Sequence, residues 1–262
     1  MKKSLILFSL ALLLTSVWYS CQKGGISANK QATTTDPLNT VDIGAWHNTV
    51  LSTLATANNK TQTFSIVEKT QSYSDLREQI IQILIKKDPA TFVESDIRSK
   101  AALFDQLNIN SQITSSVGSG KSTDQLNTIL GYLVTNKLIS TALSVEFDKI
   151  HKLTNQGADG DVILKAVNSL ATQNFAKSDQ KYLNTFVSVY NSSYSFWKSR
   201  ANNPTISISS LQTNKAASNC NTVIIAADTA GALYGLIGGP AWSIIEGGIF
   251  SALAANSDAC GS

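Results

Sequence analysis

The chain has 262 residues, of which 15% are charged, and a formal net charge of +3. This length is enough for one large domain or two small ones. The near balance of charge and the lack of a basic patch exclude a typical nucleic-acid-binding protein. The abundance of Ser, Thr, Asn and Gln suits an exported protein that neutral polar groups keep in solution.

The first 20 residues have the layout of a secretory signal peptide. Two lysines supply a basic start, and residues 5–17 form an apolar segment that is short for a membrane span. Residues 18–21 (Trp-Tyr-Ser-Cys) then resemble the lipidation signal of bacterial lipoproteins, in which a small residue precedes the modified cysteine. The resemblance implies a lipid on Cys21, and Gln22 after it implies an outer-membrane or cell-surface location. An ordinary secretory signal with a chance cysteine is the alternative.

Residues 21–40 are small and polar with no apolar period, which predicts a flexible, lipidated tether. A helical domain is expected over 41–262. Apolar residues three and four positions apart predict its first helix over 42–57, with His47 on the helix surface rather than acting as a ligand or base.

A second helix is expected over 74–87, and Asp88-Pro89 ends it and begins a third helix. The apolar positions of that third helix are Val93, Ile97, Ala101, Phe104 and Leu107. A polar loop follows over 108–119.

Residues 118–123 (Gly-Ser-Gly-Lys-Ser-Thr) look like the end of a phosphate-binding loop. That motif requires a glycine five residues before Gly120, where this chain has Ser115, and it also requires a preceding buried strand. We therefore expect no nucleotide and no other cofactor.

Two further helical stretches follow: one over 123–153, broken near Asn136, and one that Asp159 or Asp161 caps and that reaches Phe175. A helix capped by Ser178 then carries an aromatic ladder, which is core or, if exposed, a candidate ligand face for a glycan. The ladder consists of Tyr182, Phe186, Tyr190, Tyr194 and Trp197. A polar connection over 200–219 includes a short edge strand at 205–209.

Two apolar arms, 223–237 and 241–255, predict a helical hairpin. Gly238-Gly239 can end the first helix and Pro240 suits the first turn of the second. Helix-packing glycines are expected to bring the two arms close together, because a glycine lets another backbone approach. These glycines are Gly231, Gly235, Gly247 and Gly248.

The hairpin is apolar on all sides, so it is expected in a protein core or in a membrane. Each arm has about 15 residues, or about 22 Å at ~1.5 Å per residue, which is shorter than a ~30 Å bilayer core. Asp228 and Glu246 also interrupt the arms, which favours the core. The segment nevertheless resembles the glycine-rich hydrophobic helices of bacteriocins, and this resemblance implies membrane activity as the alternative.

With Cys21 lipidated, Cys220 and Cys260 remain, and outside the cytoplasm such a pair is expected to oxidise. A Cys220–Cys260 disulfide would close a loop of about 40 residues and stabilise the fold by about 4 kcal/mol. Two free thiols would need a reducing compartment. A metal site is not expected, because two cysteines and two distant histidines, His47 and His151, lack ligand spacing.

The sequence predicts one all-α domain of about six to eight helices that ends in a disulfide-closed hydrophobic hairpin over 220–260. No catalytic residues can be assigned, so we expect no enzyme. The favoured function is non-catalytic, either binding or structural, with the membrane contacted through the lipid and with a protein or glycan as partner. Insertion of residues 222–255 into a bilayer is the alternative.

Overall fold

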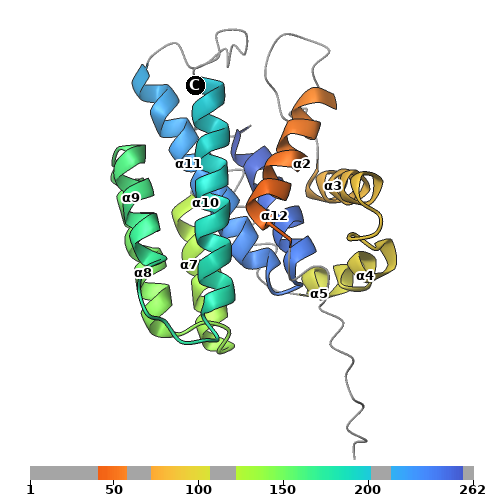
Figure 1. Cartoon of the computed structure of the whole chain (residues 1–262), viewed down its shortest axis with the longest axis horizontal. Coiled ribbons are helices and arrows are strands. Elements are labelled where there is room, and N and C mark those ends of the chain that lie inside the picture. Colours follow the sequence, from red (N-terminus) through yellow and green to blue (C-terminus); the bar gives the residue numbers. More distant parts are fainter. Residues whose placement is uncertain (1–40, 58–71, 107–121, 202–213, 256–262) are drawn as a thin grey trace, which may run out of the picture. The chain divides into compact units, whose positions relative to one another are not determined.

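The structure is a computed structural model, and it describes residues 41–57, 72–106, 122–201 and 214–255, which all belong to one compact unit, 38–262. The described residues are helical and contain no strand, which confirms the all-α prediction (Figure 1). The helices are α2 (Ile43–Ala57), α3 (Tyr73–Lys87), α4 (Glu94–Ser99), α5 (Ala101–Gln106), α7 (Ser122–Thr135), α8 (Thr141–Asn155), α9 (Gly160–Leu170), α10 (Gln180–Ala201), α11 (Asn214–Gly235) and α12 (Pro240–Ala255).

The described ranges contain more helices than the six to eight expected, because each of two predicted helical stretches forms two helices. The helix expected to begin at Asp88-Pro89 begins instead at Glu94, as α4, and continues as α5, with Lys100 between them. The stretch expected over 123–153 is α7 followed by α8, and the break lies near Asn136 as predicted. There Lys137 adopts a positive φ of 57° and the Leu133 carbonyl accepts from the backbone N–H of Leu138.

Polar side chains fix where several helices begin. Ser72 and Asp75 form a capping box at the start of α3, and Asp159 caps α9 as expected. Ser140 caps α8, and its hydroxyl and backbone N–H both donate to the buried carboxylate of Asp179. Because Asp179 immediately precedes α10, this contact joins the start of α10 to the start of α8.

The hairpin of α11 and α12 lies in the core, as predicted. Thirteen of the 16 residues of α12 are buried, and α12 packs against α11, α2 and α3. α11 packs in turn against α10, α7 and α8. A helix enclosed on every side needs an apolar surface all round, which accounts for the lack of a polar face in α12.

Glycines set the distance between the two hairpin arms. A Cβ on Gly231 would lie 2.5 Å from the Glu246 carbonyl oxygen, and one on Gly235 would lie 2.5 Å from the Ser243 Cα atom. Gly247 faces the Asp228 carbonyl oxygen of α11, whereas Gly248 faces α2 and α3 instead. Three of the four expected packing glycines thus serve the contact between the arms.

The turn between the arms also depends on glycine. Gly239 has a φ of +101°, a conformation that side-chain-bearing residues rarely adopt. The N–H group of Gly238 donates to the carbonyl of Gly235, the last residue of α11, and that of Gly239 donates to the carbonyl of Leu236 just after it. Pro240 then begins α12, where its missing N–H costs nothing.

Candidate functional site

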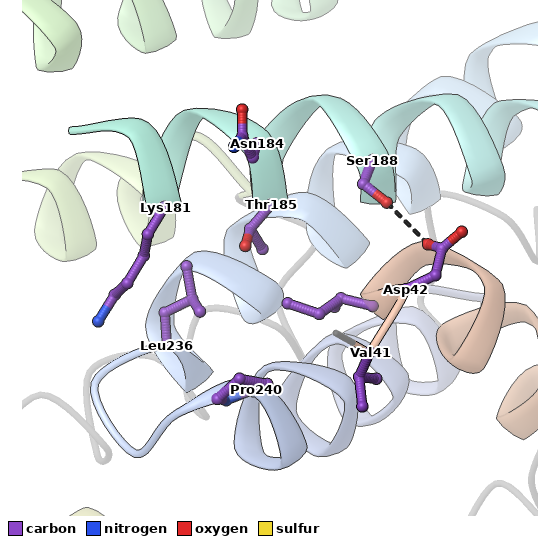
Figure 2. A pocket seen from close by; sticks show the side chains of 9 residues that line it. Val41, Asp42, Lys181, Asn184, Thr185, Ser188, Leu236 and Pro240 are labelled. Atoms are coloured by element: carbon purple, nitrogen blue, oxygen red, sulfur yellow. Dashed lines mark hydrogen bonds between the residues drawn. The ribbon is translucent and has the colours of Figure 1, made fainter. Parts of the chain in front are cut away.

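A cavity of about 470 Å³ lies where the start of α2, the first turns of α10 and the hairpin turn meet (Figure 2). Its described lining residues are Val41, Asp42, Ile43, Lys181, Asn184, Thr185, Ser188, Leu236 and Pro240. These residues come from three segments that are far apart in the sequence, so the cavity exists only in the folded domain.

The cavity has one polar wall and one apolar wall. The polar wall belongs to α10, whose lining residues at positions 181, 184, 185 and 188 have the spacing of a single helix face. The apolar wall combines Val41 and Ile43 before and within α2 with Leu236 and Pro240 of the hairpin turn. Ile43 and Leu236 are buried, so this wall is a surface of the core.

Asp42 lies at one side of the cavity and holds the start of α2 in place. Its Oδ1 atom accepts from the Ser188 hydroxyl at 3.1 Å and from the Ala45 N–H at 3.1 Å. The Ser188 hydroxyl oxygen accepts in turn from the Gly44 N–H at 3.3 Å. α2 and α10 can approach closely here because Gly44 has no side chain. A Cβ at this position would lie only 2.5 Å from the Ser188 carbonyl oxygen.

Lys181 supplies the positive charge of the cavity. Its ammonium lies 5.0 Å from the ring centroid of Tyr182. Desolvation, with a further contribution from the charge of Lys100, lowers the pKa of Lys181. Lys100 itself lies near the hairpin turn, since a Cβ on Gly239 would be 3.4 Å from its Nζ atom. In the part of the chain that the structure describes, neither lysine has a carboxylate partner.

Asp228 of α11 forms a second polar centre inside the core. It is fully buried and accepts hydrogen bonds from the Ser193 hydroxyl and, at 3.3 Å, from the Trp197 Nε1–H, both on α10. His47 Nε2 lies 3.8 Å from its Oδ2 atom. Desolvation raises the pKa of Asp228, and His47 and Ser193 oppose this rise.

Glu246 of α12 forms a third such centre. It is fully buried, and the Tyr73 hydroxyl, which donates to its carboxylate, lies 2.6 Å from each of its oxygens. Desolvation raises the pKa of Glu246 to about 7, although the Tyr73 hydrogen bond and the charge of Arg77 lower it. Arg77 stacks 4.9 Å from the Tyr73 ring centroid and pairs with Asp105 at 2.8 Å. Because Asp228 and Glu246 are both fully buried, a substrate has no access to either carboxylate.

The candidate ligand face on α10 proves to be core. Tyr182, Phe186, Tyr190 and Trp197 are each at most 2% exposed, and Phe186 stacks on Phe147 with ring centroids 4.2 Å apart. Tyr194 is partly buried, and its hydroxyl donates to Asp161 at 2.5 Å. The ladder therefore offers no exposed platform for a sugar ring.

His47 is the clearest correction to the sequence analysis. It was expected on the surface of the first helix, but it is fully buried and faces Asp228. The reason is that Gly247 provides space for its ring: a Cβ there would lie 3.1 Å from His47 Cδ2. His47 also lies four residues from the buried Ile43 and Leu51, so it shares their helix face.

Several expectations lie outside the described residues. These are the lipidation of Cys21, the signal peptide and tether, the loop over 108–119 and the edge strand at 205–209. Cys260 also lies outside, and the side chain of Cys220 in α11 is not described, so the disulfide stays a prediction. Within the described ranges, no group of three or more His, Cys, Asp or Glu side chains could hold a metal ion. No helix in those ranges is long and apolar enough to cross a membrane.

The cavity itself was not found from the sequence. Asp42 is the first residue of the helix predicted over 42–57, where an aspartate is typical of a cap, and Lys181 adjoins Tyr182 of the predicted aromatic ladder. The available signal was the spacing of Lys181, Asn184, Thr185 and Ser188, which places them on one face of α10. Comparison with known protein-family models, with curated proteins and with solved structures finds no match to this chain.

Proposed function

We propose that this chain is an exported, lipid-anchored helical protein that binds a small molecule without transforming it. The cavity between α2, α10 and the hairpin turn carries this proposal, because its volume of about 470 Å³ lies in the usual range for small-molecule sites. Its combination of an apolar wall with a few polar groups is also typical of such sites. The signal-peptide layout of residues 1–20 and the resemblance of residues 18–21 to a lipidation signal support the export and the anchor.

The cavity favours binding over catalysis. No histidine or cysteine is among its described lining residues. The hydroxyl hydrogen of Ser188 is donated to Asp42, a carboxylate that also caps α2. A nucleophile needs an adjacent base that is itself oriented by a third group, and the described lining residues do not form such a set.

The proposal is tested by filling the cavity. Asn184→Trp places an indole in the polar wall, whereas Ser195→Trp places one on an exposed position of the same helix outside the cavity. A fragment library is screened against the wild-type protein by amide chemical shifts in NMR spectra. We expect a set of fragments to shift amides around Thr185, Ser188 and Leu236, and Asn184→Trp but not Ser195→Trp to abolish these shifts. Fragments that bind equally well to both variants would refute the cavity as the site.

Membrane activity of residues 222–255 is the second candidate. One observation favours it: the two arms contact each other through the backbone at Gly231 and Gly235, so the hairpin keeps its own internal contact if it leaves the domain. The domain without its lipid should then float with anionic liposomes, and more so below pH 7, where Glu246 becomes neutral within the fold. A domain that stays in solution at pH 5 with its hairpin resistant to protease would rule out this activity.

A further inference from the structure

The cavity carries opposite charges at its two sides. In Figure 2, Lys181 extends from α10 along the hairpin turn, and Asp42 lies across the cavity at the start of α2. Leu236, Pro240 and Val41 are the apolar residues labelled around the space that the two charged groups flank. Among the ion pairs of the described residues, none joins Lys181 to Asp42.

Each charged group retains capacity for a further partner. The two donors that bind Asp42, Ser188 and Ala45, both contact Oδ1, and Oδ2 has no hydrogen-bond partner in the described ranges. An ammonium has three donors and no acceptor. The Lys181 ammonium lies over the Tyr182 ring and has no acceptor among the described side chains. A ligand can therefore bring one acceptor and one donor to the cavity without displacing a contact within the protein.

The groups between the charges select against a fully polar ligand. Ile43 and Leu236 are only 9% and 2% exposed, so they back the cavity as fixed parts of the core, whereas Val41 and Pro240 are partly exposed and present apolar surface to it. Burying apolar atoms against such a surface is favourable, whereas burying an unpaired polar group there is not. A matching ligand has its two polar groups at its ends and an apolar middle.

We propose that the cavity binds an extended zwitterion, with its carboxylate at Lys181, its ammonium at Asp42 and an apolar middle against Val41 and Pro240. The inference rests on the proposed function and adds the chemical class of the ligand. Short peptides with free termini and ω-amino acids both have this chemistry. A simple anion or a simple cation satisfies only one of the two sides.

The electrostatics of Lys181 agree with this assignment. Desolvation and the nearby charge of Lys100 lower its pKa, so the empty cavity disfavours the charged amine. A carboxylate bound beside the amine opposes both effects. Binding of the ligand should therefore raise the pKa of Lys181, which NMR titration of its side chain measures.

The test compares three probes of equal length: ω-aminooctanoate, octanoate and octylamine. Calorimetry with the wild-type protein should show ω-aminooctanoate binding about fivefold more tightly than either singly charged probe, as expected for one additional partly exposed ion pair. Trileucine with free termini is the peptide probe, and its N-acetylated and C-amidated forms should each lose about the same factor. If ω-aminooctanoate binds more tightly than trileucine with free termini, the ligand is an ω-amino acid. If trileucine binds more tightly, the ligand is a short peptide.

Conservative variants assign each end of the ligand. Lys181→Gln should reduce ω-aminooctanoate to the affinity of octylamine, and Asp42→Asn, which keeps a cap on α2, should reduce it to that of octanoate. Two controls are matched to these variants: Lys165→Gln at another exposed lysine, and Asp159→Asn at the exposed aspartate that caps α9. Both should bind like the wild type.

The outcomes separate the two proposals. If all three probes bind equally and Asn184→Trp abolishes their binding, the cavity is a site but recognises only the apolar middle, and the zwitterion is refuted. If the zwitterion binds best but the cap control Asp159→Asn weakens it as much as Asp42→Asn does, the assignment of Asp42 is refuted. If no probe and no library fragment shifts the cavity amides, both the ligand class and the proposed function fail.

Discussion

Single side chains decide how the apolar hairpin tolerates charge. Asp228 and Glu246 are the two carboxylates in its arms, and each is fully buried with partners from other helices. Burial without such partners would be far more costly, because a desolvated carboxylate needs hydrogen bonds or a counter-charge. The partners come from α3 for Glu246 and from α10 and α2 for Asp228, so each carboxylate also fixes how the hairpin is oriented in its surroundings.

Glu246 should make the stability of the domain depend on pH. Its pKa rises from 4.5 to about 7 on folding, so between these values the folded state binds more protons than the unfolded state. The free energy of unfolding should therefore decrease as pH rises through this window, by about 3 kcal/mol in total. Glu246→Gln keeps an acceptor for Tyr73 and should remove this contribution.

Urea unfolding at pH 5 and pH 8 measures the effect. The wild-type protein should lose more stability between these two pH values than Glu246→Gln does, and the difference between them isolates Glu246 from Asp228. Glu94→Gln, an exposed glutamate paired with Arg98, serves as the control and should leave the pH dependence nearly unchanged. Equal losses in wild type and Glu246→Gln would show that Glu246 does not titrate in this range.

At the scale of helices, the sequence predicted well which segments are helical, but it did not predict which side chains on each helix face the core. The periodic apolar positions located α2 and α3 within a residue of their starts, because a half-buried helix must repeat its apolar residues every three to four positions. His47 was assigned to the wrong face of α2, because its burial depends on Gly247, 200 residues later in the chain. The cavity was missed for the same reason: Asp42, Lys181 and Leu236 meet only through the tertiary fold.

The hairpin glycines should differ sharply from a glycine elsewhere. Gly235→Ala puts a methyl group 2.5 Å from the Ser243 Cα atom, so the arms must separate, and we expect a loss of about 1–3 kcal/mol. Gly131 lies within α7 with nothing within 4 Å of its Cβ position, so Gly131→Ala should instead stabilise by about 1 kcal/mol. Chemical denaturation of both variants gives the comparison. A neutral Gly235→Ala would mean that the arms do not pack as closely as the structure shows.

The predicted Cys220–Cys260 disulfide would fasten the two ends of the hairpin. Reduction should lower the free energy of unfolding by about 4 kcal/mol, since a loop of about 40 residues then regains its freedom in the unfolded chain. Peptide mapping without reductant should identify the linked pair, and unfolding with and without reductant gives the energy. A variant with both cysteines replaced by serine should not respond to reductant. Two alkylatable thiols in the purified exported protein would contradict the disulfide.

At the scale of the whole molecule, the proposed lipid on Cys21 would hold the domain at a membrane through its N-terminal tether. Among the described helices, none has the length and apolar character needed to cross a membrane. Acyl chains contribute about 0.8 kcal/mol for each buried CH₂ group, and more than one chain is needed for stable anchoring. Cys21→Ser should therefore release the protein from the membrane fraction almost completely.

Fractionation of expressing cells, followed by mass spectrometry of the N-terminal peptide, tests this anchor. The wild-type protein should be found with the membranes and carry the mass of a lipid on Cys21, and Cys21→Ser should be found in the soluble exported fraction. Cys220→Ser is the control, because it removes a cysteine that is not expected to carry lipid. If Cys21→Ser stays with the membranes, the hairpin or another part of the chain must hold the protein there, and the membrane-active function would gain support over the binding function.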